Sequence, residues 1–286
     1  MKIKQKKIST LLDALPYIKK FYGKTIVIKY GGSAQTNDEL KQKFALDISL
    51  LVLVGIKPVI VHGGGEKISQ MLDALDIKSS FIDGHRVTCA QSMNIVEMVL
   101  SGSVNKEITS LLNFYGVKSI GISGKDSNLI KAKTKDSSVY GFTGDIVNVD
   151  GQVINNLLSN SLVPVIAPIG YSGELSHPGF NINADMAASK IATAIKADKV
   201  LFLTDTKGVL DKDGKLLSSM DRQKIEKYKK DGTIVGGMIP KVDSCIEAIY
   251  GGVDKAHIID GAVEHSILLE LFTSDGIGTQ ILKDTI

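Results

Sequence analysis

The sequence feature that most constrains the fold is the apolar run Val-Ile-Val at residues 59–61, which ends at His62 and three consecutive glycines, Gly63–Gly65. β-Branched residues favour a strand that is covered on both faces, and residues 66–75 carry apolar side chains at helical spacing. A strand, a glycine turn and a helix in this order present backbone N–H groups that can bind an anion. The alternative is a tight turn that binds nothing. The glycines match neither the P-loop nor the dinucleotide-binding pattern.

Similar apolar runs alternate with amphipathic segments along most of the chain. Strands are predicted at residues 25–30, 59–61, 117–122, 162–167, 199–204 and 256–259. Because helical patterns separate these runs, we expect an α/β fold of three layers, with a central, mainly parallel open sheet between two layers of helices.

Several segments are less regular. Residues 82–88 are predicted to form an irregular polar connection, residues 128–150 a hairpin, and residues 170–183 a linker. Separate helices are expected near residues 93–100 and 104–112. An amphipathic helix is predicted at residues 10–22, with Thr10 in a capping box at its start and Pro16 bending or splitting it.

The composition is that of an ordinary globular protein. The chain has 286 residues, 43% of them hydrophobic, and a formal net charge of +3, which gives no reason to expect nucleic-acid binding. Cys89 and Cys245 lack metal-ligand spacing and are expected to be reduced thiols. No apolar run approaches the roughly 20 residues of a membrane span, so we expect no membrane partner and a cytoplasmic location. The scattered histidines predict neither a metal site nor a Ser-His-Asp hydrolase.

Two lysines stand at positions where an anion would bind. Lys29 is the next-to-last residue of the strand at residues 25–30, shortly before Gly31 and Gly32, and the alternative is that its ammonium group only reaches solvent. Lys241 is expected to open a helix, where the positive end of the helix dipole disfavours a cation unless an anion compensates it.

Other polar residues have two readings from pattern alone. Arg86 lies in a polar segment and could bind a carboxylate through two hydrogen bonds, or could be a surface arginine. Asn181, Asn183 and Asp185 precede a helix, and Asn183 or Asp185 could simply cap it.

Six motifs follow one another through nearly the whole chain. They are Ile28-Lys29-Tyr30-Gly31-Gly32, Val61-His62-Gly63-Gly64-Gly65, Gly84-His85-Arg86-Val87-Thr88, Asn181-Ile182-Asn183-Ala184-Asp185, the segment 203–209, and Gly237-Met238-Ile239-Pro240-Lys241. Taken together, in this order, they resemble the amino acid kinase family, and in particular its members that phosphorylate N-acetyl-L-glutamate.

This resemblance implies the fold of that family, an N-lobe at residues 23–172 that binds N-acetyl-L-glutamate, and a C-lobe at residues 173–286 that binds ATP, with Mg²⁺ carried by the nucleotide. It implies catalytic roles for Lys29, Lys241 and Asp185. The residues implied to bind the acceptor substrate are Gly64, Gly65, Arg86 and Asn181. The residues implied to bind the nucleotide are Gly31, Gly32, Asp205, Lys207, Gly208, Val209, Leu210 and Met238. No metal ligand is implied in the protein itself.

The resemblance also implies regulation. Residues 1–22 would form an oligomerisation helix that joins three dimers into a hexamer, and L-arginine would inhibit the enzyme. The implied arginine site contains His257, Glu270 and Gly276, with Tyr17 or Tyr22 covering it. Rival functions are another kinase of the family, such as one acting on aspartate, a nicotinamide-dependent oxidoreductase, and a non-catalytic amino-acid sensor.

Overall fold

The computed structural model describes residues 2–284. Met1, which belongs to the expected oligomerisation helix, and residues 285–286, which belong to the expected C-lobe, lie outside the described residues. Within residues 2–284, one sheet of eight strands runs through the molecule in the order β12-β14-β13-β11-β1-β2-β8-β5. Its strands are β1 (Thr25–Tyr30), β2 (Lys57–His62), β5 (Ser119–Ser123), β8 (Val163–Ala167), β11 (Lys199–Thr204), β12 (Ser219–Met220), β13 (Lys255–Asp260) and β14 (Thr279–Ile281). Neighbouring strands are parallel except β13 and β14.

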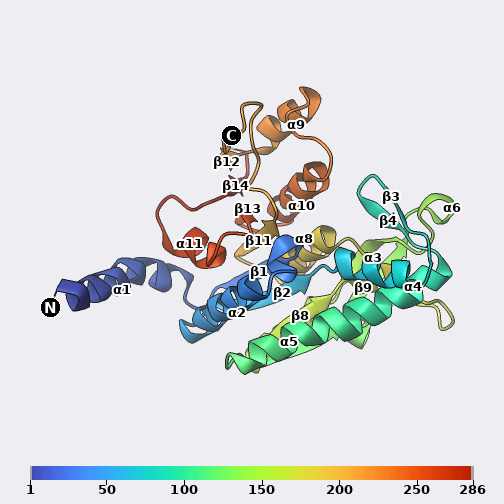
Figure 1. The fold of residues 1–286 in the computed structure, drawn as a ribbon, viewed down its shortest axis with the longest axis horizontal. Coiled ribbons are helices and arrows are strands. Elements are labelled where there is room, and N and C mark those ends of the chain that lie inside the picture. The colour runs from blue at the N-terminus through green and yellow to red at the C-terminus, as the bar shows by residue number, and fades with distance from the viewer. Residues whose placement is uncertain (1, 285–286) are drawn as a thin grey trace.

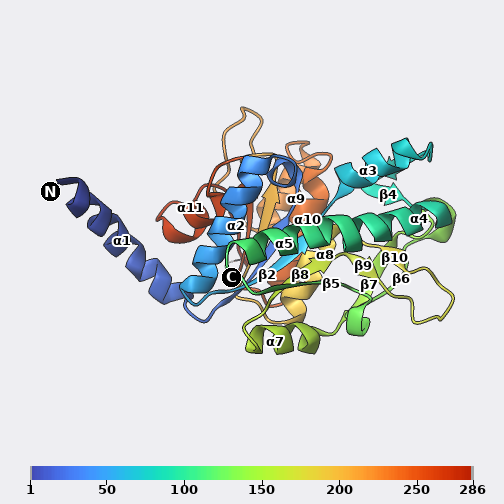
Figure 2. The same ribbon diagram turned by 60° about the horizontal axis from the view of Figure 1, so that its bottom comes forward.

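Helices cover both faces of this sheet (Figures 1 and 2). One face is covered by α2 (Asp38–Leu53), α3 (Gly65–Ala74), α4 (Ala90–Glu97), η2 (Met98–Val104), α5 (Asn105–Phe114) and α11 (Ser266–Phe272). The other is covered by α7 (Gly151–Ser159), α8 (Ala184–Ala194), α9 (Arg222–Lys230) and α10 (Met238–Tyr250). The predicted three-layer α/β fold with a mainly parallel sheet is therefore confirmed.

The alternation of side chains along β1 shows why both faces are apolar. Ile26, Ile28 and Tyr30 belong to one hydrophobic core and Val27 to the other. Successive strand residues point to opposite faces, so a central strand between two helical layers needs apolar residues at nearly every position. Lys29 shares its face with Val27, which directs its side chain toward the layer that contains α8 and α10.

Smaller elements complete the fold. The predicted hairpin excursion is present as β6 (Ile130–Thr134) and β7 (Gly144–Val149), with the short helix α6 (Ser137–Tyr140) between them. Inside the expected linker, β9 (Ile169–Gly170) pairs with β10 (Phe180–Asn181). Short 3₁₀ turns lie at η1 (Gly32–Gln35) and η3 (Asp126–Asn128).

The structure differs from the expected local structure in four places. The connection near residue 85 is a regular hairpin of β3 (Ser80–Ile82) and β4 (His85–Val87), because Asp83 and Gly84 both adopt the positive φ angles of a tight hairpin turn. The two helices expected at residues 93–112 form one continuous helical run, α4-η2-α5, whose middle part is a π-helix. The edge strand β12 and its neighbour β14, which pairs antiparallel with β13, were not anticipated.

The fourth difference concerns α1 (Lys2–Phe21), which starts well before Thr10 and continues through Pro16. Thr10 is thus interior to the helix and does not cap it, and Pro16 does not split it. Figures 1 and 2 show α1 projecting away from the body of the molecule. Ile8 and Leu12 on this helix are 58% and 60% exposed, so apolar surface remains uncovered there.

Candidate active site

Two glycine turns meet at the carboxyl edge of the sheet. Gly31 follows β1 and Gly63 follows β2, and these strands are parallel neighbours with Tyr30 paired to His62. The Gly63 N–H donates a hydrogen bond of 2.8 Å to the Tyr30 carbonyl, which ties the second turn to the first strand. Ligands of open α/β sheets bind at this edge, so the turns lie where a phosphate site is expected.

A buried ion cluster lies beside these turns and joins three elements. Lys29 comes from β1, Asp185 from the first turn of α8, and Lys241 from the first turn of α10. Lys29 Nζ lies 3.1 Å from Asp185 Oδ1, and Lys241 Nζ lies 2.8 Å from Asp185 Oδ2. One carboxylate therefore holds two ammonium groups side by side, although the three residues are far apart in the sequence.

Of the two residues expected as possible caps of α8, Asn183 and Asp185, the structure shows that Asn183 is the N-cap. The side chain of Asn183 accepts hydrogen bonds from the backbone N–H groups of Asp185 and Met186 and is the N-cap. The carboxylate of Asp185 is thus free to pair with lysines. Helix α10 starts at Met238, so Lys241 is the fourth residue of the helix and does not open it as expected.

Charge pairing controls the protonation of the cluster. Burial alone would raise the pKa of Asp185, but the ammonium groups of Lys29 and Lys241 lower it to about 2. Burial lowers the pKa of Lys29 below its ordinary value, and the carboxylate of Asp185 opposes this effect. Near neutral pH the carboxylate is charged and attracts both lysines.

Two glycines of the first turn lie close to charged side chains. Gly32 has φ +69°, and a Cβ there would clash with Asp205 Oδ1. That same oxygen accepts a hydrogen bond of 2.5 Å from the Ser33 N–H. A Cβ at Gly31 would lie 2.9 Å from Lys29 Nζ. A side chain at either position would therefore disturb a charged group of the site.

Arg86 and Asn181 line a second hollow of about 130 Å³, next to Gly64 and Gly65. Arg86 is 5% exposed, and burial lowers the pKa of its guanidinium. Its Nη2 donates hydrogen bonds of 2.9 Å to the Gly65 carbonyl and to Ser69 Oγ. The arginine is consequently held against the first turn of α3, and is a buried residue of the hollow, not a surface arginine.

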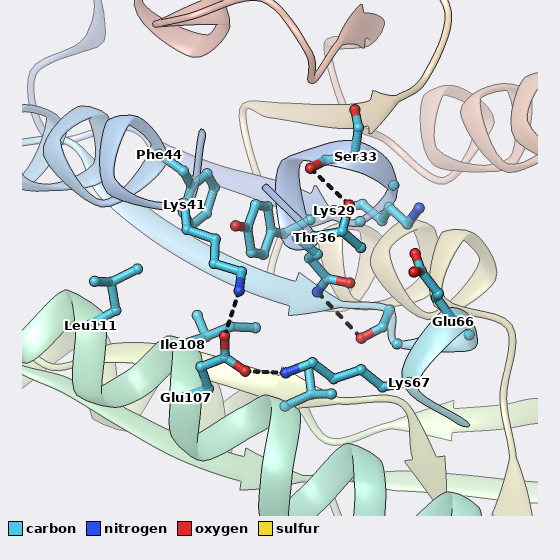
Figure 3. Close-up of a pocket in the computed structure, with 18 of the residues that line it drawn as sticks. Lys29, Ser33, Thr36, Lys41, Phe44, Glu66, Lys67, Glu107, Ile108 and Leu111 are labelled. Atoms are coloured by element: carbon cyan, nitrogen blue, oxygen red, sulfur yellow. Dashed lines mark hydrogen bonds and ion pairs between the residues drawn. The ribbon is translucent and has the colours of Figure 1, made fainter. Parts of the chain in front are cut away.

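A larger cavity, of about 520 Å³, begins at Lys29 and the two glycine turns and extends between α2 and α5. Figure 3 shows the side chain of Glu107 between Lys41 and Lys67. Burial would raise the pKa of Glu107, but hydrogen bonds from Lys67 and Lys41 hold it below its ordinary value. This ion cluster joins α2, α3 and α5. Sequence reasoning missed it, because no spacing within one segment relates its members.

The residues expected to bind nucleotide occupy two loops of the same edge. Lys207, Gly208, Val209 and Leu210 follow the carboxyl end of β11, and Met238 begins α10. Val209 is buried, and its N–H donates a hydrogen bond of 2.8 Å to Thr279 Oγ1, which ties this loop to β14. Asp205 connects the same loop to Gly32 through the contacts described above.

The residues of the implied arginine site form a separate cluster at α11 and β13. His257 Nδ1 lies 2.5 Å from Glu270 Oε1, and His257 Nε2 lies 3.0 Å from Lys199 Nζ. Glu270 Oε2 accepts the N–H groups of Ile277 and Gly278. Gly276 has φ +63°, and a Cβ there would lie 2.7 Å from Glu270 Oε2. In this conformation the Glu270 carboxylate is already fully paired.

Among residues 2–284, no group of three or more His, Cys, Asp or Glu side chains is arranged to hold a metal ion. Within the same range, every helix is too short or too polar to cross a membrane.

The fold and this site define an α/β protein that can bind a phosphorylated ligand and a carboxylate at one edge of its sheet. Residues 24–260 match the amino acid kinase family. The chain is 68% identical over 277 residues to an acetylglutamate kinase of Aliarcobacter butzleri, a match that covers 97% of this chain and 92% of that protein. It is 64% identical to an acetylglutamate kinase of Nitratiruptor sp., over 99% of both chains. The chain therefore belongs to the amino acid kinase family, and it is an enzyme of the kinase class.

Solved structures agree on the fold. An N-acetylglutamate synthase from Neisseria gonorrhoeae superposes with a TM-score of 0.87 at 26% identity, covering 98% of this chain and 64% of that one. The carbamate kinase of Giardia lamblia bound to AMP-PNP superposes with a TM-score of 0.69 at 19% identity, which bears on the fold alone.

Proposed function

We propose that this enzyme transfers the γ-phosphoryl group of ATP to the side-chain carboxylate of N-acetyl-L-glutamate, giving N-acetylglutamyl 5-phosphate in arginine biosynthesis. The observation that carries the proposal is the pair of ammonium groups, Lys29 and Lys241, held by Asp185 beside two glycine turns. The relatives named acetylglutamate kinase, at 68% and 64% identity over nearly the whole chain, support this choice of substrate.

The chemistry needs positioning and charge. Phosphoryl transfer places negative charge on the equatorial oxygens of the transferring group, and the protein contributes mainly alignment and electrostatic stabilisation. The acceptor is a carboxylate with an ordinary pKa of about 4.3, so it is already a nucleophilic anion at neutral pH. It needs no general base. Its approach to ATP is opposed by charge repulsion, which Lys29 and Lys241 would offset.

Each part of the site has a role in this proposal. Asp185 positions both lysines. Arg86 and Asn181 bind the α-carboxylate side of the acceptor, while the N–H groups of Gly64 and Gly65 face its reacting end and the γ-phosphoryl group. ATP enters as its Mg²⁺ complex, with its phosphates at Gly31 and Gly32. Its nucleoside would lie on the loops that contain Asp205, Lys207, Gly208, Val209, Leu210 and Met238.

Regulation forms a second level of the proposal. L-Arginine would inhibit the enzyme from a site that contains His257, Glu270 and Gly276, with Tyr17 or Tyr22 covering it. To bind there, the arginine cation would replace present partners of the Glu270 carboxylate. The exposed apolar side chains of the projecting α1 support a role in contacting a second copy of the chain, giving a cytoplasmic hexamer built as a trimer of dimers. Tighter binding of arginine to a less active state would shift the population of states.

An acceptor panel tests the catalytic proposal. Purified enzyme is assayed for ADP release with N-acetyl-L-glutamate, aspartate, glutamate, carbamate and UMP, and an acyl phosphate product is trapped with hydroxylamine. We expect turnover with N-acetyl-L-glutamate to exceed that with every other acceptor and to yield a hydroxamate. Preferred turnover of another acceptor would assign the enzyme to a different activity of the family.

A further inference from the structure

The Gly63 carbonyl, at the start of the second glycine turn, has two side-chain neighbours that can donate to it. His62 Nδ1 lies 2.8 Å from this oxygen, and Gln35 Nε2 donates to it at 3.3 Å. A carbonyl oxygen only accepts hydrogen bonds, so the Nδ1 atom of His62 carries a proton. Gln35 belongs to η1, the turn that follows β1. Both glycine turns are thereby linked at one oxygen atom.

The opposite side of the His62 ring is held by Asn105. Asn105 Nδ2 lies 3.1 Å from His62 Nε2 and also donates to the backbone carbonyls of Val165, at 2.9 Å, and Ile122, at 3.2 Å. Those two carbonyls identify the Nδ2 atom as the one that faces the ring. Because its NH₂ group has two hydrogens for three acceptors, its contact with the ring is a shared hydrogen bond. In the neutral ring the single proton is on Nδ1, so the Nε2 atom of His62 is the acceptor. His62 and Asn105 are both completely buried, and burial lowers the pKa of His62 to about 4.

Peptide geometry connects this network to the anion site. In a trans peptide the C=O of one residue and the N–H of the next lie in one plane and point in opposite directions. The orientation of the Gly63 carbonyl therefore determines the direction of the Gly64 N–H. Because two side chains donate to that carbonyl, the amide group that precedes α3 is held in one direction before any ligand arrives.

We propose that His62 and Asn105 are a positioning pair, which fixes the Gly63 carbonyl so that the Gly64 N–H is preorganised for the charge of the transferring phosphoryl group. This inference rests on the proposed function for its substrate. It assigns His62 no proton transfer: the ring is a neutral spacer between the amide of Asn105 and the glycine turn.

The helical run α4-η2-α5 supports the glycine turn at further points. A Cβ at Gly64 would lie 2.6 Å from Leu100 Cδ2 and 3.3 Å from Val104 Cγ2, and both of these residues belong to the π-helical part. Asn105 follows directly after it. π-Helical turns inside α-helices are frequent at functional sites. Here the turn brings two packing residues and the positioning amide onto the same glycine loop.

The test compares variants of the full-length enzyme in the acceptor assay. His62→Phe and Asn105→Leu each remove one member of the positioning pair. We expect kcat to fall by about 10²-fold, as for a small misplacement of a reacting group. KM for both substrates should change little, because the misdirected N–H acts mainly on charge that develops in the transition state. Asn113→Leu is the matched control, since Asn113 is an exposed residue of α5 bonded to Ser119, and its kcat should equal that of the unchanged enzyme.

Two further variants test the inference, and the second, at the half-buried Gln35, keeps it testable if a buried substitution fails to fold. His62→Asn retains an N–H donor near the position of Nδ1. Its kcat should be higher than that of His62→Phe and within about tenfold of the unchanged enzyme, because a tenfold loss corresponds to about one neutral hydrogen bond. Gln35→Leu removes the other donor from a half-buried turn and should lower kcat by about tenfold. Equal kcat in His62→Asn and His62→Phe would overturn the proposal, as would unchanged kcat in Gln35→Leu.

Hydrogen exchange gives a readout that does not depend on turnover. In Gln35→Leu and Asn105→Leu, peptides that span residues 63–68 should exchange faster, whereas Asn113→Leu should leave them unchanged. Unaltered exchange in this segment would also overturn the proposal. If the enzyme prefers another acceptor, the proposed substrate fails, and the same variants are compared on that acceptor. The positioning inference is then judged by the kcat ratios and the exchange rates alone.

Discussion

Replacing Asp185 by asparagine is the sharpest test of the ion cluster. The side chain keeps its shape but loses its charge, while the ammonium groups of Lys29 and Lys241 stay in place. In the folded protein the pKa of Asp185 falls from the ordinary 3.8 to about 2, and one unit corresponds to roughly 1.4 kcal/mol. Pairing therefore outweighs burial, and the net stabilisation of the charged carboxylate is about 2–3 kcal/mol. Because removing one member of a buried ion pair leaves an uncompensated charge, the full cost of Asp185→Asn should be about 3–5 kcal/mol.

The pH dependence has a definite sign. A carboxylate whose pKa is lowered by folding adds stability above its unfolded pKa, near 4, and this contribution is lost as the pH falls toward 2. The difference in unfolding free energy between the unchanged enzyme and Asp185→Asn should therefore be constant from pH 5 to 7 and shrink below about pH 4. Urea unfolding at a series of pH values measures it.

Catalysis supplies the second readout of the same variant. Burial already lowers the pKa of Lys29, and Asp185 is the group that opposes this. Without the carboxylate, Lys29 should lose its proton at a lower pH, so the alkaline limb of the kcat profile should move to lower pH. We also expect kcat to fall by about 10²–10³-fold at neutral pH. A variant with an unmoved alkaline limb and a stability within about 0.5 kcal/mol of the unchanged enzyme, the range of ordinary surface substitutions, would refute the reasoning.

Four other outcomes are expected. Lys29→Ala and Lys241→Ala should each lower kcat by about 10²–10³-fold with an unchanged circular dichroism spectrum; near-normal turnover in either would remove that lysine from the catalytic assignment. Arg86→Ala should raise KM for N-acetyl-L-glutamate with a smaller change in kcat, and a change confined to KM for ATP would assign the arginine to the other substrate. Gly32→Ala combines a positive φ with a clash against the neighbouring aspartate, so thermal unfolding should show a loss of about 1–3 kcal/mol; an unchanged melting temperature would contradict this. Removal of residues 1–22 should leave active dimers with a weakened arginine response, measured by light scattering and inhibition curves, and a full-length enzyme that is dimeric or insensitive to arginine would contradict the regulatory proposal.

Local patterns were sufficient for the central strands. The runs that became β1, β2 and β11 are apolar and β-branched, and a strand buried on both faces allows little else. The Asp83-Gly84 hairpin was recognisable as well, since Asp-Gly is a signal for a tight hairpin turn, but the polar residues around it favoured an irregular segment. The continuous run α4-η2-α5 was not predictable in this way, because Leu100 and Val104 of its π-helical part lie against Gly64, a contact between segments that are distant in the sequence.

In the site, too, some features follow from local sequence patterns and others depend on packing between distant segments. Lys29 and the glycine turns were identifiable from their position after apolar strands, whereas the pairing of Lys29 and Lys241 with Asp185 depends on how helices from the second half of the chain pack on the sheet. Spacing left the role of Asp185 open, and only the resemblance favoured one reading. Asn105 could not be identified from the sequence. The groups that it contacts, two backbone carbonyls and an imidazole, come from three different strands.

The continuous sheet has a consequence for how the chain can be divided. Strand β1, which carries Lys29, pairs with β2 on one side and with β11, from the second half of the chain, on the other. A fragment that ended at residue 172 would expose β1 as an edge whose residues from Ile26 to Tyr30 are all buried in the intact chain, and such edges invite intermolecular pairing and aggregation. The segments on the two sides of residue 172 are therefore not expected to fold separately. Because β11 covers the edge of β1, the presence of the second half should prevent aggregation of the first. If the gene were split at this boundary, both pieces would have to be co-expressed.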